Sequence, residues 1–195
     1  QDDAIAAAVA ANLGVWGAVE AGDRLVEILS DQARSIALRM AAAEALGDLG
    51  ETRFRDVLQQ LASTGDLKTR YIAIPALAKA DLLSAAGATA VVLGEDPGDA
   101  DPAALVAIFL QRERGASLLL KELKADTLHP LAVERVATYH RRTGQLPKSL
   151  VSIFAPSASL SLSQALLREK RNALTADVEE KGDPVRGEMI FRRQS

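Results

Sequence analysis

Few side chains in this 195-residue chain could bind a metal ion or catalyse a reaction. His129 and His140 are the only histidines, and they lie near the two ends of one expected helix, so we do not expect them to share a metal ion. Four acidic residues fall between positions 95 and 101, and carboxylates are suitable ligands for Ca²⁺. Their spacing is not that of a known calcium-binding loop, and we interpret this segment as a solvated turn.

Motifs typical of enzymes are missing from the sequence. There is no phosphate-binding loop, no paired His-Glu motif on a helix and no recognisable Ser-His-Asp set. There is also no cysteine, which excludes disulfides, thiolate metal sites and covalent attachment of a c-type haem within this chain. We therefore expect a non-catalytic chain that holds no cofactor and no metal ion.

Composition and charge narrow the class of partner. The formal net charge is −3, whereas nucleic acids usually select a basic surface, so we expect no nucleic-acid partner. No apolar run approaches the ~18 residues of a membrane span, so we expect no direct membrane insertion. The acidic start "QDDAIAAAVAANLG" is not a signal peptide, and we interpret a chain that begins with Gln1 as a fragment of a longer protein.

A repeat organises the middle of the chain. The segment "RMAAAEALGDLG" begins at Arg39, and the similar "RYIAIPALAKAD" begins 31 positions later at Arg70. A further shift of 31 leads to Asp101, and a weaker copy, "PLAVERVATYHRR", follows. We expect the core positions of the third and fourth copies to be filled by Ala104, Ala107, Ile108, Val133, Val136 and Ala137. The stretch "AAAVAANLG" is read as an earlier, partial copy.

Each copy follows a second amphipathic segment. In "ETRFRDVLQQLAS", Phe54, Val57, Leu58 and Leu61 fall at the spacing of one helical stripe. Helix pairs that cannot bury their stripes alone stack into solenoids. We therefore predict that residues 1–155 form an all-α, right-handed superhelix of four to five helix pairs. We expect Trp16 to plug its N-terminal end.

The segment "ALRMAAAEALGDLGE" strongly resembles HEAT repeats, especially the short repeats of lyase-type HEAT proteins. Arg39 and Arg70 stand at the motif's arginine, and we expect them to join neighbouring repeats through loop aspartates or backbone groups. The resemblance implies that the arginine-bearing helices line the concave face, where a protein partner would bind. The exposed candidates for that contact are Lys68, Tyr71, Lys79, Arg135 and Tyr139.

The C-terminal part differs in composition. "APSASLSLSQ" breaks the array, so residues 156–182 are interpreted as a linker and a long helix. Residues 183–195 resemble the opening helix of a class I cytochrome c, which reads Gly-Asp-x-x-x-Gly-x-x-Ile/Val-Phe before the haem-binding Cys-x-x-Cys-His. The matching positions are Gly182, Asp183, Gly187, Ile190 and Phe191. The chain ends at Ser195, before any such motif.

Repeats followed by a cytochrome c start resemble bacterial membrane-bound dehydrogenases that are exported and end in a haem c domain. The resemblance implies a non-catalytic scaffold or docking module between a dehydrogenase domain and a haem c domain, periplasmic or exported, with haem only in the parent protein. One alternative is a free-standing protein-interaction scaffold. Another is a lyase-type HEAT protein that handles a tetrapyrrole, for which Tyr71, Tyr139 and His140 are the candidate contacts.

Overall fold

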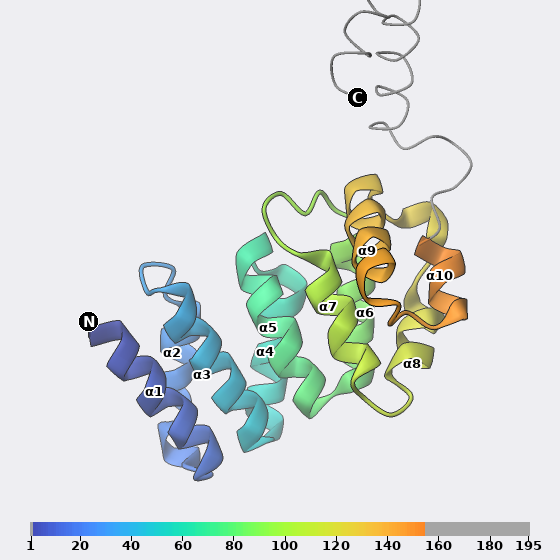
Figure 1. The fold of residues 1–195 in the computed structure, drawn as a ribbon. Helices are drawn as coiled ribbons and strands as arrows, with labels where there is room; N and C mark the ends of the chain where they lie inside the picture. Colours follow the sequence, from blue (N-terminus) through green and yellow to red (C-terminus); the bar gives the residue numbers. More distant parts are fainter. Residues whose placement is uncertain (1, 155–195) are drawn as a thin grey trace, which may run out of the picture. The chain divides into compact units, whose positions relative to one another are not determined.

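The described part of the protein, residues 2–154 of a computed structural model, consists of helices joined by short turns, without a strand (Figure 1). Two short 3₁₀ helices, Val19–Ala21 and Ala125–Thr127, lie in the connections. Within these residues the α-helices are α1 (Asp2–Val15), α2 (Gly22–Ser30), α3 (Ile36–Leu49), α4 (Thr52–Thr64), α5 (Leu67–Ala80), α6 (Leu82–Leu93), α7 (Pro102–Leu110), α8 (Gly115–Glu122), α9 (Pro130–Thr143) and α10 (Lys148–Phe154).

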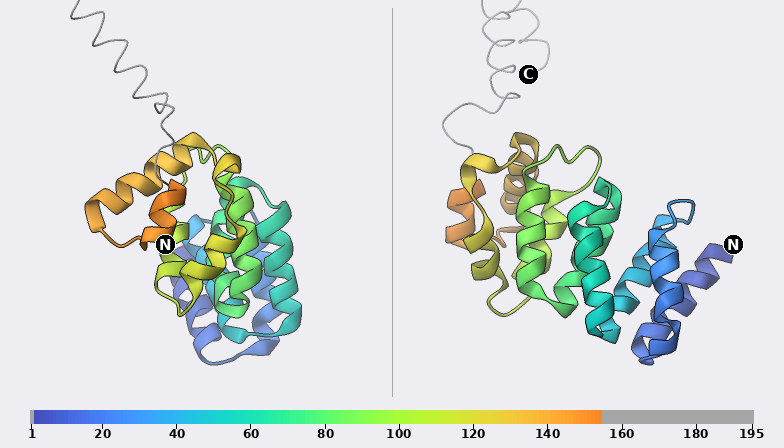
Figure 2. Two further views of the ribbon diagram at one scale, coloured as in Figure 1. Left: turned by 90° about the vertical axis from the view of Figure 1, so that its right-hand side faces the viewer. Right: turned by 180° about the vertical axis from the view of Figure 1, so that it is seen from behind.

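The helices of residues 2–154 stack in two layers (Figures 1 and 2). Helices α1, α3, α5, α7 and α9 follow one another in the odd layer, and α2, α4, α6, α8 and α10 form the even layer. The pairs α2–α3, α4–α5, α6–α7 and α8–α9 correspond to the expected repeats, with α1 and α10 flanking them. The prediction of an all-α array of paired helices is therefore confirmed.

Aspartate and serine side chains start several of these helices. Asp66 accepts a hydrogen bond from Thr69 N at 2.9 Å, and Asp101 accepts one from Ala103 N at 3.0 Å. Ser35 and Asp81 cap α3 and α6 in the same manner. Such side chains satisfy backbone N–H groups that have no partner within the first helical turn. Asp66 and Asp101 therefore mark the starts of α5 and α7.

Small residues allow the helices of the odd layer to approach closely. A Cβ atom placed on Gly14 of α1 would lie 2.6 Å from Ala45 Cα of α3. One repeat later, a Cβ atom on Gly47 of α3 would lie 2.7 Å from the carbonyl oxygen of Ala76 in α5. Both distances are too short for a side chain, so these contacts depend on glycine. The same close contact thus recurs between α1 and α3 and between α3 and α5.

The expected register of the third copy is wrong. Ala104 is exposed and Ala107 and Ile108 are only partly buried, whereas Val106 and Phe109 are completely buried. The loop before α7 is longer than the Gly65–Asp66 turn before α5, and it shifts the buried stripe by two residues. In the fourth copy Val136 is buried as expected, while Val133 and Ala137 are partly buried.

Trp16 does not plug the array. Trp16 is the residue after α1 ends, and its side chain is 73% exposed. The expectation that it closes the N-terminal end of the repeats is therefore also wrong. The sequence places Trp16 at the N-terminal end of the repeats, but no neighbouring helix among the described residues covers it. The expected linker at 156–182 and the cytochrome-like segment at 183–195 lie outside the described residues.

Candidate partner-binding surface

Three of the five expected contact residues lie on α5. Lys68 is exposed near the start of the helix, and Tyr71 lies one turn further on and is half-buried. Lys79, near the C-terminal end, forms an ion pair with Asp48 of α3, with Nζ 2.9 Å from Oδ1. The side of α5 that carries these residues faces away from α4, so it belongs to the outer surface of the odd layer.

Tyr71 directs its hydroxyl group inward. The Tyr71 Oη atom is buried and has no hydrogen-bond partner among the described residues. Burial, together with the nearby carboxylate of Asp101, raises the pKa of Tyr71 to about 12, although the charge of Arg135 opposes this shift. The phenol is therefore neutral at physiological pH, and its buried hydroxyl is not available to a partner.

The other two expected residues, Arg135 and Tyr139, lie on α9 and share an open pocket of about 490 Å³. Asp101 and Ala103 from the start of α7 complete its wall, and its floor combines apolar and charged side chains. The α9 residues that line it are Leu131, Glu134, Arg135, Thr138, Tyr139, Arg142 and Thr143. The structure thus brings two of the five candidates together in one concave site.

Both of these residues also make contacts within the chain. Arg135 donates to the carbonyl oxygens of Ala100 at 2.5 Å and Gly98 at 2.7 Å, and so fixes the loop before α7 against α9. The hydroxyl of Tyr139 donates to Gln145 Oε1 at 2.5 Å, just beyond the C-terminal end of α9. Hydrogen bonds within the chain therefore fix the positions of both side chains in the pocket wall.

The repeat arginine Arg39 is part of the interior. Its guanidinium is almost completely buried, and it donates to the carbonyl oxygen of Leu29 at 2.9 Å and to Thr69 Oγ1 at 2.6 Å. Leu29 is the penultimate residue of α2, and Thr69 lies in the first turn of α5. Arg39 therefore joins the two helices of its own repeat to the next repeat, and it is not available to a partner.

Arg70 occupies the same motif position but bonds differently. It forms a two-pronged ion pair with Glu95, with Nη1 2.7 Å from Oε1 and a second contact between Nη2 and Oε2. This pair lowers the pKa of Glu95 through the hydrogen bonds and the positive charge of Arg70. It also fastens the acidic loop to α5. Asp96 in that loop accepts from Gly98 N, so these carboxylates serve separate local contacts.

The histidines are also placed separately. His129 caps α9 by accepting from Leu131 N at 3.3 Å, and His140, in its last turn, accepts from Leu146 N at 3.3 Å. Across the described residues, no group of three or more metal-ligating side chains lies close enough to hold an ion. Of the three tetrapyrrole candidates, only Tyr139 lines the pocket, so the structure does not bring that set together.

Comparison with known proteins identifies the repeat type. Residues 1–80 match the family model for HEAT repeats, which covers α1 to α5. Residues 1–80 are therefore similar to HEAT repeats, and the packing of the described helices in pairs is consistent with a HEAT-type solenoid. Searches of curated proteins and of solved structures found no match. No helix within residues 2–154 has the length and apolar character needed to cross a bilayer.

We expect Asp66→Asn to reduce the loss in the free energy of unfolding that the chain shows as the pH is lowered from 7 to about 3. Hydrogen bonds from Thr69 N and Oγ1, helped by the charge of Arg39, lower the pKa of Asp66. A carboxyl with a lowered folded pKa stabilises the fold above its unfolded pKa, near 3.9, and this contribution is lost as the pH falls through the folded pKa. Asparagine retains the cap, so the loss at pH 7 should stay below about 1 kcal/mol.

Urea unfolding at pH 7 and at about pH 3 measures this difference. The control Gln32→Ala removes a neutral neighbour that donates to Asp66 at 2.7 Å, and it should keep the pH dependence of the unaltered chain. Equal pH dependence in Asp66→Asn and in the unaltered chain would contradict the prediction.

Proposed function

We propose that this chain is a non-catalytic scaffold whose odd layer docks a folded protein domain. HEAT repeats generally mediate protein interactions, and a solenoid offers an extended surface for a partner. The observation that carries the proposal is the open pocket beside α9, which is lined by charged and apolar side chains and in which Arg135 and Tyr139 are fixed by hydrogen bonds within the chain. Lys68 on α5 extends the same layer with a further positive charge.

The finer proposal places the scaffold between a dehydrogenase domain and a haem c domain of a larger, exported oxidoreductase. It is supported by the sequence of the last 14 residues, "GDPVRGEMIFRRQS", in which the glycines, Asp183, Ile190 and Phe191 occupy the positions of a cytochrome c opening helix. This chain has no cysteine for haem attachment, so the proposed haem c domain is encoded outside these 195 residues.

The experiment is to read and express the codons that follow Ser195 in the natural gene. We expect a Cys-x-x-Cys-His motif within about 10 residues and covalent haem in the extended protein, detected by its absorbance after denaturation. A reading frame that stops at Ser195, or that continues without this motif, would remove the haem c part of the proposal. The docking surface would then be tested as that of a free-standing scaffold.

A further inference from the structure

Helix α1 presents an uncovered apolar side at the N-terminal end of the array. Ile5 is 65% exposed and Val9 52%, and they share one side of the helix with the exposed Asn12; Trp16, directly after the last residue of α1, continues this side and is 73% exposed. Their spacing of four, three and four residues is that of a helix contact stripe. We name these four residues the α1 end face. Terminal repeats of solenoids normally present a polar outer side, which the α1 end face lacks.

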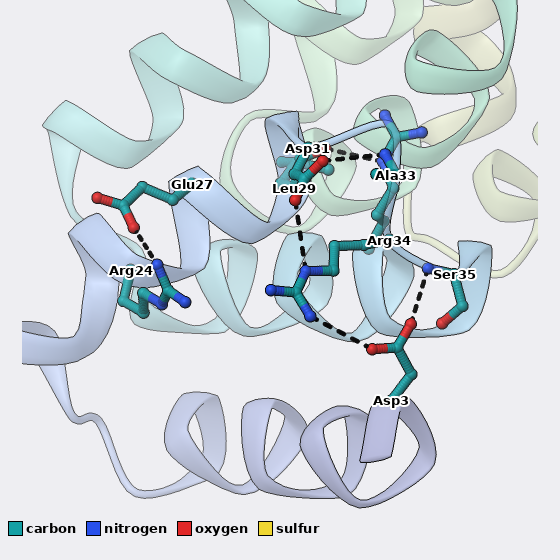
Figure 3. A network of polar contacts seen from close by, with 9 residues as sticks. Asp3, Arg24, Glu27, Leu29, Asp31, Ala33, Arg34 and Ser35 are labelled. Carbon is teal, nitrogen blue, oxygen red and sulfur yellow. Dashed lines mark hydrogen bonds and ion pairs between the residues drawn. The ribbon is translucent and has the colours of Figure 1, made fainter. Parts of the chain in front are cut away.

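Helix α1 is packed as a regular member of the odd layer. Asp3 accepts a hydrogen bond from Ser35 N at 3.0 Å and pairs with Arg34, so it fixes the start of α1 beside the start of α3 (Figure 3). Gly14 contacts Ala45 near the other end. The two helices therefore run in the same direction, and α1 has the position of the second helix of an earlier repeat.

The two close glycine contacts define which residues are equivalent. Gly14 meets Ala45 as Gly47 meets Ala76, so positions in α1 correspond to positions in α3 after a shift of 33, and positions in α3 correspond to positions in α5 after a shift of 31. The equivalents of Ile5, Val9, Asn12 and Trp16 are therefore Leu38, Ala42, Ala45 and Leu49 in α3, and Thr69, Ala73, Ala76 and Ala80 in α5.

Where a preceding repeat is present, the first three of these positions in each helix are buried, and the last, Leu49 or Ala80, is partly buried. Leu38 is 1% exposed and Ala42 is 0% exposed, because α1 and α2 cover them. Ala73 and Ala76 of α5 are likewise 0% exposed beneath α3 and α4. The α1 end face has the position of these surfaces without the cover. It is therefore equivalent, by the repeat, to a surface that the fold already covers twice.

We propose that the α1 end face is the docking surface for a further HEAT-type helix pair, encoded immediately before Gln1 in the same polypeptide. The second helix of that pair runs parallel to α1 and presents small residues to it, as α1 does to α3. The helix that leads into α1 covers its remaining side, as α2 covers α3. This inference stands apart from the haem c proposal, because it uses only residues at the opposite end of the repeats.

Single cysteines provide the test, since the chain has none of its own. Val9→Cys reports on the α1 end face. Met40→Cys is the matched control, because Met40 is 46% exposed on the outer side of α3, which an added repeat does not cover. Each variant is prepared in the 195-residue chain and in a chain extended by the roughly 50 residues that its gene encodes before Gln1, about one and a half repeats. The measurement is the rate of thiol alkylation.

We expect the extension to slow alkylation of Val9→Cys at least tenfold and to leave Met40→Cys unchanged. A second design carries a copy of residues 19–66 directly before Asp3, which places Ile5 and Val9 after the copied α4 as Thr69 and Ala73 follow α4 here. It should show the same selective protection, so the test does not depend on the folding of one extended chain.

Two results would overturn the proposal. One is equal alkylation rates of the two cysteines in the naturally extended chain. A natural reading frame that is too short to encode a helix pair before Gln1 counts as the same result. The other is protection of Val9→Cys in the 195-residue chain as its concentration rises, with a matching increase in molecular mass. That result would show that a second copy of the chain covers the α1 end face.

Discussion

Arg39→Ala should lower the free energy of unfolding by about 3 kcal/mol. The guanidinium is buried and donates to a backbone carbonyl of α2 and to the hydroxyl of Thr69 in α5. Alanine leaves both acceptors unpaired in the interior and opens a cavity. It also removes a positive charge near Asp66, whose side chain caps α5.

Urea unfolding followed by circular dichroism measures the loss. Arg53→Ala is the matched control, because Arg53 is an exposed arginine whose ion pair with Asp23 spans 3.3 Å at the surface, and its removal should cost less than about 1 kcal/mol. Arg39→Lys keeps a charge but cannot make both hydrogen bonds, so it should lose most of the stability that alanine loses. Equal unfolding midpoints for Arg39→Ala and Arg53→Ala would contradict this role.

The same substitution at two helical glycines should have opposite effects. Gly47→Ala puts a methyl group 2.7 Å from the backbone carbonyl oxygen of Ala76, which cannot move without displacing α5. We expect a loss of about 2 kcal/mol, after allowing for the better helix propensity of alanine. Gly87, inside α6, has only the flexible carboxylate of Glu122 within 4.0 Å, so Gly87→Ala should stabilise by about 0.5–1 kcal/mol.

Thermal unfolding of the two variants tests this pair directly. Both changes add one methyl group to a helix interior, so a propensity effect alone would shift both melting temperatures upward. A Gly47→Ala chain that is as stable as Gly87→Ala would show that α3 and α5 can move apart without loss of stability. Opposite shifts would support close helix approach as the reason for glycine at position 47.

The first two repeats could be predicted from sequence because their core positions repeat as alanine and leucine at constant spacing. The boundaries of α2, α4 and α6 follow from the same stripes and from the caps. The third copy could not be placed, because Val106 and Phe109 fill its core in place of alanine and leucine. A longer loop before α7 changes the register of the repeat. The length of a loop does not reveal which side of the following helix is buried.

The polar contacts of the candidate surface were less accessible to sequence analysis. The motif marks both repeat arginines as equivalent, but Arg39 lies in the interior while Arg70 reaches Glu95 in a distant loop. Nothing in the local sequence of Tyr71 distinguishes a buried hydroxyl from an exposed one. The bonds from Arg135 to Gly98 and Ala100 involve backbone carbonyls, which any residue type supplies, so no pattern of side chains could have indicated them.

The exposure of Trp16 has a spectroscopic consequence. It is the only tryptophan in the chain, and its indole already lies largely in water in the folded state. Unfolding therefore changes its surroundings little, and the intrinsic fluorescence of the isolated chain should be almost silent during global denaturation. An ordinary melting curve recorded by tryptophan emission would make a cooperatively folded array look as if it had no transition, and far-ultraviolet ellipticity is the signal that follows the helices.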